Sequence, residues 1–432
     1  MTSIPKQISL FPIMLVNFIG TLGFSIVLPF LVFLVTDFGG NALVFGIVAA
    51  MYPAFQLIGA PILGRWSDLY GRKKVLLVSQ GGTLAAWIIF LLALFLPVEN
   101  IFDVDSAIFG TFVITLPLLV LFVARSLDGI TGGNVSVANA YLADVTSEAN
   151  RSKNFGKMAI SSNLGFIVGP AIAGVLGATV YEETLPVLAA LFLSLAAIFV
   201  IKFSLKESKL SVIRKIQEKE NVRKVFVHEC KDCYKIQDPK KISFKDVFKL
   251  KHIPYMLTLY FFIFLGFNIF YVSFPIHAVI GLGWNITQMG IFFAVLSGIM
   301  ALVHGPILSK ASKKFSDGVL VIIGSIILGI NFIFFISNDI VLLYVAAVLF
   351  AVGNGLMWPS VMSILSKCAG NDHQGAVQGI AGSFGSLASI IGLIAGGILY
   401  GFFEENVFLI SAGIIFVVFI MSFRLLRITK NT

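Results

Sequence analysis

Long apolar stretches alternate with short polar ones along the whole chain. Each apolar stretch has at least the roughly 20 residues that a helix needs to cross a hydrocarbon core about 30 Å thick. We predict twelve membrane-spanning helices, over residues 11–34, 43–65, 74–96, 113–140, 157–178, 184–204, 253–279, 286–309, 317–337, 339–361, 375–400 and 405–427. A transmembrane β-barrel would instead show short segments of alternating polarity. The pattern therefore predicts an all-α integral membrane protein that crosses the bilayer many times.

One long polar stretch, rich in Lys and Glu, separates six of these spans from the other six. We predict an N-terminal six-helix half over residues 1–204, a cytoplasmic linker over 205–252 and a C-terminal six-helix half over 253–432. Short matches recur in the same order in both halves: residues 61–63 with 306–308, 128–129 with 354–355, and 169–176 with 392–399. Such repeats predict two pseudo-symmetric halves with a binding site between them at the membrane midplane.

Composition and charge agree with this topology. The chain is 58% hydrophobic and 12% charged, whereas soluble domains are about 45–50% apolar and about 25% charged, so a soluble fold is excluded. All 31 Lys and Arg except Arg125 lie on one side of the predicted spans, and the loop that carries Glu99, Asp103 and Asp105 has none. The positive-inside rule then predicts that both termini are cytoplasmic, in the plasma or inner membrane. The net charge of +9 reflects topology, and we expect no nucleic-acid partner.

The loop after the second span carries a specific motif. Residues 64–76 read G-R-W-S-D-L-Y-G-R-K-K-V-L, which resembles the G-x-x-x-D-x-x-G-R-[RK]-x-x-L signature of the major facilitator superfamily. The resemblance implies that the loop latches the two halves together in one conformation. The latch residues would be Gly64, Asp68, Gly71, Arg72 and Lys73, with Asp144 at the end of the fourth span. The alternative is a basic loop that only sets the topology.

Two further motifs point to one branch of this family. Arg125, Gly129 and Gly132 fit R-x-x-Q-G-x-x-G, with Asp128 where Gln is commoner. Gly165, Gly169, Pro170 and Gly174 fit the antiporter motif G-x-x-x-G-P-x-x-G-G, except that Ala173 replaces one glycine. Together they resemble the tetracycline-type, twelve-helix drug:proton antiporters. The alternative is that the small residues serve helix packing and Pro170 only bends its helix.

Arg125 and Asp128 are the charged residues expected inside the membrane. They are three residues apart and so share one helix face. Ionisable groups at this depth are costly and are functional by default. The first span contains no acid, only Asn17. We predict that Asp128 is the proton-coupling acid with Arg125 as its partner; a permanent ion pair that only fixes the helix is the competing interpretation.

The resemblance implies that the first, fourth, seventh and tenth spans line the substrate cavity. The further polar or amphipathic residues at middle depth on those spans are candidate substrate contacts: Asn17, Asn268, Tyr271, Asn354 and Trp358. The competing interpretation for any single one of them is an interhelical hydrogen bond.

Metal and cofactor chemistry is not indicated. His228, Cys230 and Cys233 in the linker form a C-x-x-C with a nearby histidine, but a closed zinc site usually needs two separated ligand pairs. We expect a reduced, metal-free linker. The chain has no Walker loop, so ATP is not the direct energy source. No nucleophile and base are spaced for catalysis in the spans, and we expect neither a cofactor nor enzyme activity.

These observations predict a secondary active transporter that exports a small drug-like molecule or metabolite in exchange for protons. One alternative is a proton symporter or facilitator for a sugar or organic anion, with Arg125 facing a carboxylate. An alternative of another class is a non-transporting membrane receptor or scaffold. We expect a monomer whose partners are its substrate, protons and membrane lipid.

Overall fold

The computed structural model describes residues 9–27, 29–106, 109–132, 134–146, 151–208, 222–225, 228–231 and 247–430. Within these residues, nine helical stretches are long and apolar enough to cross a membrane. One of them, Val377–Thr429, contains two crossings joined by a turn, and two shorter apolar helices, Phe11–Ser25 and Ile286–Leu302, each belong to a further crossing. Nine plus one plus two gives the twelve spans that the sequence predicts.

The first six crossings are built from eight α-helices and one π-helical turn. They are α1 (Phe11–Ser25), α2 (Leu31–Asp37), α3 (Ala42–Tyr70), α4 (Arg72–Ala93), α5 (Leu116–Thr131), α6 (Asn134–Val145), α7 (Arg151–Gly177), α8 (Thr184–Phe199) and η2 (Val200–Ser204).

The last six crossings follow from residue 253 onward. They are α10 (Ile253–Ile276), η3 (His277–Gly281), α11 (Ile286–Leu302), η4 (Val303–Ile307), α12 (Leu308–Ala311), α13 (Asp317–Phe334), α14 (Ile340–Phe403), η5 (Glu404–Asn406), α15 (Val407–Ser422) and α16 (Leu425–Lys430).

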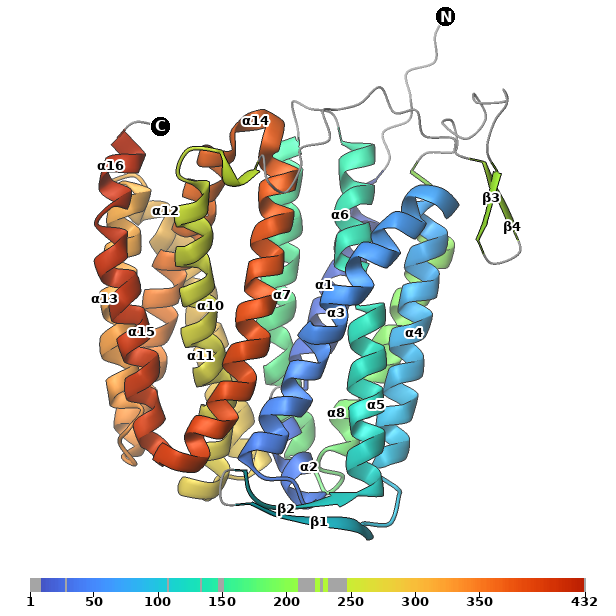
Figure 1. Cartoon of the computed structure of the whole chain (residues 1–432), viewed down its shortest axis with the longest axis vertical. Coiled ribbons are helices and arrows are strands. Elements are labelled where there is room, and N and C mark those ends of the chain that lie inside the picture. The colour runs from blue at the N-terminus through green and yellow to red at the C-terminus, as the bar shows by residue number, and fades with distance from the viewer. Residues whose placement is uncertain are drawn as a thin grey trace, which may run out of the picture.

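Four predicted spans differ from the structure in detail. The span predicted over 11–34 is broken between α1 and α2, where Pro29 lacks the amide hydrogen that a continuing helix needs. The span predicted over 113–140 begins only at Leu116 and is broken after Thr131, next to a pair of glycines. The spans predicted over 339–361 and 375–400 form one continuous helix, α14, which turns at one end of the bundle (Figure 1).

The bundle has two distinct ends (Figure 1). At one end, β1 (Asn100–Ser106) and β2 (Gly110–Thr115) pair as an antiparallel hairpin with Asp105 opposite Thr111. The amide of Val113 donates to the carbonyl of Gly39 at 2.8 Å, which ties β2 to the turn before α3. At the other end lie α16 and the short pair β3 (Val222–Val225) and β4 (His228–Lys231) of the linker. We call these the hairpin end and the linker end.

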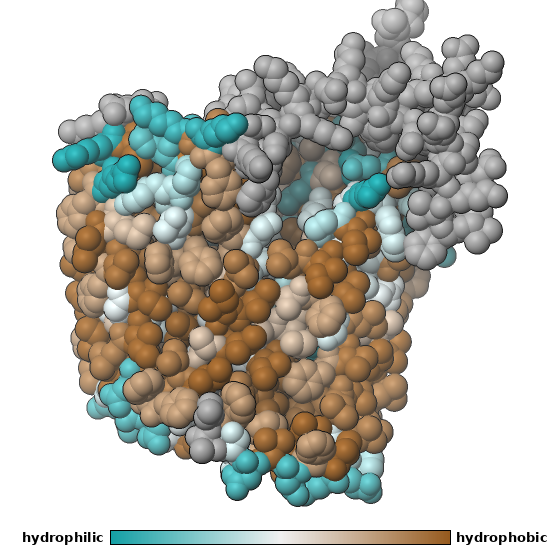
Figure 2. Space-filling model, in the orientation of Figure 1, coloured by the Kyte–Doolittle hydropathy of each residue, from teal (hydrophilic) through white to brown (hydrophobic). Residues whose placement is uncertain are grey.

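The surface between the two ends is apolar, as a lipid-facing surface must be. Figure 2 shows a hydrophobic belt with hydrophilic residues at both ends. Large apolar side chains are exposed on this belt, among them Ile58, Val78, Ile88, Leu92 and Val123. In water such a surface would be an aggregation hazard. In a bilayer the same apolar surface faces the lipid chains.

The two halves repeat the same helix contacts. Gly169 on α7 packs against Leu22 of α1, with a Cβ there only 2.9 Å from the Leu22 carbonyl oxygen. Gly392, its counterpart on α14, packs against Leu265 of α10 at 3.0 Å in the same way. The weak repeats in the sequence therefore mark equivalent helix interfaces in the two halves.

The halves meet each other through glycines near the hairpin end. A Cβ on Gly174 of α7 would collide with the Cα of Gly290 on α11. A Cβ on Gly46 of α3 would lie 2.5 Å from the carbonyl oxygen of Leu393 on α14, and Gly397 closely approaches the carbonyl of Ala42. All of these residues lie within three turns of the helix ends that adjoin the hairpin end. This conformation is therefore closed at the hairpin end.

Candidate substrate cavity and interdomain loop

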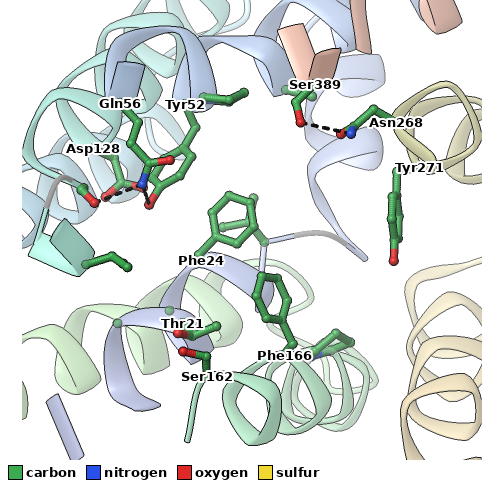
Figure 3. A pocket seen from close by; sticks show the side chains of 18 of the residues that line it. Thr21, Phe24, Tyr52, Gln56, Asp128, Ser162, Phe166, Asn268, Tyr271 and Ser389 are labelled. Atoms are coloured by element: carbon green, nitrogen blue, oxygen red, sulfur yellow. Dashed lines mark hydrogen bonds between the residues drawn. The ribbon is translucent and has the colours of Figure 1, made fainter. Parts of the chain in front are cut away.

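A cavity of about 610 Å³ lies between the two halves. Most of its wall is apolar or aromatic, with side chains such as Phe24, Phe166 and Trp87 from the first half and Phe264 and Phe267 from the second. In Figure 3, Phe24 and Phe166 lie between Tyr52, Gln56 and Asp128 on one side and Asn268, Tyr271 and Ser389 on the other. This wall suits a drug-sized apolar molecule oriented by a few polar groups.

Arg125 and Asp128 both line this cavity from α5. Their side chains form an ion pair, with 3.3 Å between Nη1 of Arg125 and Oδ2 of Asp128, and both residues are buried. Their three-residue spacing on the helix predicted this pairing. The Thr83 hydroxyl of α4 also lines the cavity, 3.3 Å from the hydroxyl of Thr131 on α5.

Residues of α3 complete the surroundings of the pair. The Arg125 guanidinium lies over the ring of Tyr52, 5.2 Å from its centroid, a cation–π arrangement. Gln56 donates to the Tyr52 hydroxyl at 3.2 Å and to the carbonyl of Gly132 at 3.0 Å (Figure 3). Gly132 also provides the space for Tyr52, since a Cβ there would lie 2.6 Å from the tyrosine oxygen.

Sequence reasoning missed Tyr52, Gln56 and Thr83. It expected the cavity wall from the first, fourth, seventh and tenth spans only, whereas α3 and α4 also contribute. A signal was available: Gln56 is an uncharged polar residue deep inside an apolar span, and such groups face protein or water rather than lipid.

Four candidate contacts of the second half do line the cavity. Asn268 donates to the carbonyl of Phe264 at 2.7 Å and to Ser389 at 3.0 Å, so its amide also links α10 to α14. Trp358 packs its ring against those of Tyr260 and Phe264, and Tyr271 lies against Phe350. The amide nitrogen of Asn354 contacts only the sulfur of Met300, at 3.8 Å.

Asn17 is the exception among the candidate substrate contacts. Its amide donates to the Ser162 hydroxyl at 2.6 Å and to the carbonyl of Met158 at 3.1 Å, both on α7. The residue is buried between α1 and α7 and does not belong to the cavity wall. In this conformation Asn17 therefore makes the interhelical hydrogen bonds that were its competing interpretation.

The loop between α3 and α4 gathers a charge cluster at the linker end. Arg72 pairs with Asp68 at 2.6 Å and with Asp144 of α6 at 3.1 Å. The four-residue spacing of Asp68 and Arg72 and the placing of Asp144 near the motif agree with the sequence analysis. These contacts all lie within the first half.

Glu207, just after η2, also joins this cluster. Its carboxylate accepts hydrogen bonds from the backbone amides of Arg72 at 2.8 Å and Lys73 at 3.2 Å, as a cap of the α4 N-terminus. Gly71 makes this possible, because its φ of 96° suits glycine and a Cβ there would lie 2.8 Å from Glu207. Gly64 has no such neighbour within 4 Å. No local sequence signal connects residues 135 positions apart.

The glycines of the antiporter-like motif on α7 are packing sites. Gly165 lies against Phe18 of α1, where a Cβ on the glycine would be 2.8 Å from the Phe18 carbonyl oxygen. Gly169 lies against Ser25 of the same helix. Gly174 makes the contact with α11 described above. Pro170, inside α7, lines the cavity.

The structure describes the backbone of two of the three linker residues considered for metal binding. His228 and Cys230 lie on β4, opposite Val225 and Arg223, and Cys233 lies outside the described residues. Across the part of the chain that the structure describes, no group of three or more His, Cys, Asp or Glu residues is placed to bind a metal ion.

Comparisons with known proteins agree with this architecture. The sequence model of the Major Facilitator Superfamily matches residues 13–330 and, overlapping with these, 302–432. The class C tetracycline resistance protein of Escherichia coli is 26% identical over 86% of this chain and 84% of its own length. Multidrug resistance protein 1 of Bacillus subtilis is 27% identical over 91% of this chain and 90% of its own length.

Solved structures show the same fold at low sequence identity. A D-xylose-proton symporter superposes with a TM-score of 0.70 at 14% identity, over 95% of this chain and 97% of that one. The human organic anion transporter MFSD10 superposes with a TM-score of 0.65 at 16% identity, over 97% of this chain and 100% of that one. The predicted fold of twelve helices in two halves is confirmed.

Proposed function

This chain belongs to the major facilitator superfamily, and from that premise we propose that it exports a small drug-like molecule or metabolite in exchange for protons. The chain is a multi-pass membrane transporter and not an enzyme. Its relatives include proteins named for tetracycline and multidrug resistance, which supports export and an amphipathic substrate.

The observation that carries the proposal is the buried Arg125–Asp128 pair on the cavity wall. Burial disfavours the charged carboxylate, whereas the neighbouring guanidinium favours it. A carboxylate balanced in this way takes up or releases a proton when water or substrate changes its surroundings. Because the pair lines the cavity, substrate and proton can compete for the Asp128 carboxylate.

The same pairing weakens the organic-anion alternative. A substrate carboxylate would have to displace Asp128 from Arg125, since the two side chains are already within 3.3 Å of each other. The structural similarity to a sugar symporter concerns the fold and does not indicate which substrate this chain transports.

We further propose alternating access between two conformations around this cavity. The present conformation is closed at the hairpin end by the glycine contacts. In the other conformation, closed at the linker end, Asp68 would bind the second half. By the positive-inside rule the linker end faces the cytoplasm.

Asp128→Asn tests the proposed coupling. We expect this variant, in proteoliposomes with an imposed pH gradient, to lose gradient-driven accumulation of its substrates by at least about tenfold. Downhill exchange should persist, because the amide keeps the shape of the site but does not release a proton. Tetracycline and ethidium are the first compounds to assay, within a wider panel of drugs and metabolites.

Asp103→Asn is the control for this experiment, because it removes one acid from the exposed β1 strand. It should leave accumulation unchanged. Accumulation by Asp128→Asn with the pH dependence of the wild type would show that Asp128 is not the coupling residue.

A further inference from the structure

Two residues of the second half that line the cavity carry buried polar atoms without a described partner. Within the described residues, both ring nitrogens of His304 and Oδ1 of Asn354 are buried and make no hydrogen bond. Both residues line the cavity. Leaving a buried polar atom without a partner is energetically costly. Most such atoms in native proteins are satisfied, so each exception calls for an explanation.

His304 and Asn354 lie on neighbouring helical segments that pack against each other. His304 belongs to the π-helical turn η4, and its Cδ2 is 3.7 Å from the Cβ position of Gly355 on α14. Asn354 is the adjacent residue of α14, and its only described contact is with the weak acceptor sulfur of Met300. Both residues therefore belong to the α11–α14 side of the cavity wall.

The internal repeat shows what is unusual about this place. Asn354 corresponds to Asp128 in the matched segments, and the residue that corresponds to Arg125 is the buried Ala351. The first half thus fills this position with an internal ion pair. In the second half, Oδ1 of Asn354 and the imidazole of His304 have no described hydrogen-bond partner within the protein.

We propose that His304 and Asn354 form a subsite for a hydroxyl or primary amide group on an otherwise neutral, aromatic substrate. A neutral imidazole offers one donor and one acceptor, and the asparagine Oδ1 offers an acceptor. A hydroxyl can donate to one of them and accept from the other. The aromatic part of the substrate would lie on Trp358, one helical turn beyond Asn354, and on the neighbouring Tyr260 and Phe264.

A charged end group fits this subsite poorly. Among the residues that line the cavity, the only Asp, Glu, Lys or Arg side chains are Arg125 and Asp128, which already neutralise each other. A carboxylate at the subsite would face the Asn354 oxygen, and a quaternary ammonium would have no counter-ion there. The proposal rests on the proposed function only in taking this cavity as the substrate site.

A matched ligand pair tests the subsite. Binding of 2-naphthol and 2-methoxynaphthalene to the purified full-length protein is measured by equilibrium dialysis, without any pH gradient. The ether keeps the two aromatic rings and an acceptor but loses the hydroxyl donor. We expect the wild type to prefer the naphthol by about tenfold, as sites built to hydrogen-bond a hydroxyl do.

His304→Leu and Asn354→Leu should each reduce this preference to less than about threefold, while affinity for the ether changes little. His304→Gln keeps a donor and an acceptor and should retain most of the preference. Ser383→Ala, which removes an exposed hydroxyl of α14 outside the cavity wall, should leave the preference unchanged. Binding of the ether reports that each variant is folded.

An undiminished preference in both leucine variants, or no preference in the wild type, would overturn the subsite. Because no gradient is applied, the result is independent of proton coupling. If Asp128→Asn still accumulates substrate like the wild type, the coupling proposal fails while the naphthol preference stands.

Discussion

Glu183 precedes α8 at the hairpin end, close to the carboxylates of Asp37 and Glu182. Burial raises the pKa of Glu183, a hydrogen bond from its own backbone lowers it, and the charges of Asp37 and Glu182 raise it further. Burial and the charge of Glu182 likewise raise the pKa of Asp37. Asp37 is the last residue of α2, and the two glutamates precede α8, so only the fold brings these acids together.

The sign of the pH effect follows from the raised pKa of Glu183. Between the unfolded pKa, about 4.3 for a glutamate, and the higher folded pKa, the native state binds more protons than the unfolded state. The free energy of unfolding therefore falls as pH rises through this window, and the charged group is unfavourable above it. Glu183→Gln removes that cost at neutral pH.

We expect Glu183→Gln to raise the melting temperature of the detergent-purified protein by about 1–2 °C at pH 7. The melting temperature should also change less than that of the wild type as pH rises from 4 to 7. Below about pH 4 the two proteins should converge, because the wild-type side chain is then protonated in both states. Differential scanning fluorimetry measures this, with the exposed Glu99→Gln as control. Equal melting temperatures at pH 7 would contradict the prediction.

At the scale of whole elements, glycines set how closely helices approach. On α11, Gly290 meets Gly174 of α7 backbone to backbone, whereas Gly298, two turns further along, has no atom within 4 Å of a Cβ position. The first contact joins the two halves, and it exists only while the hairpin end is closed. The closed hairpin end therefore requires a glycine at position 290 but not at position 298 of the same helix.

Gly290→Ala should shift the protein toward the conformation that is open at the hairpin end. A methyl group in a filled interface costs about 1–3 kcal/mol, which corresponds to a shift of about 5- to 150-fold in the equilibrium. In a background without Cys230, Cys233 and Cys368, an impermeant maleimide applied from the hairpin side should label Phe45→Cys, a cavity residue, faster. Gly298→Ala should leave the labelling rate unchanged. Equal rates in both variants would show that the glycine contact does not control the closed state.

At the scale of the whole molecule, the proposed alternating access is a balance between two conformations, each closed at one end. The closed hairpin end is seen directly in the glycine contacts, and the loop with Asp68 and Arg72 lies at the opposite end with its described ion pairs inside the first half. This is the arrangement expected of a latch that is released. In the Asp68–Arg72 pair the aspartate side chain is half exposed. Exposed ion pairs contribute about 0–1 kcal/mol to the free energy of unfolding, so removing this pair should scarcely affect folding.

Asp68→Asn should therefore change the balance between conformations rather than stability. We expect insertion and melting temperature near those of the wild type, reduced transport, and slower maleimide labelling of Phe45→Cys from the hairpin side. The direction is opposite to that expected for Gly290→Ala, so one assay separates the two roles. Unchanged labelling together with full transport would indicate that the loop only sets the topology.

The sequence alone determined the number of spans, the family and the pairing of Arg125 with Asp128. Bilayer thickness dictates the length of an apolar helix, and a three-residue spacing places two side chains on one helix face. The division at residues 204 and 253, and the orientation in the membrane, remain predictions from the polar stretch and the basic residues.

Tertiary structure decided which polar side chains reach the cavity. Asn17 and Asn268 look alike in sequence, yet only Asn268 lines the cavity, while Asn17 is bound to α7. Lipid-facing and protein-facing sides of these helices are both apolar, so hydropathy does not reveal how each helix is rotated about its axis. Tyr52 beside Arg125, and His304 beside α14, follow from that rotation and from the packing of helices distant in the chain.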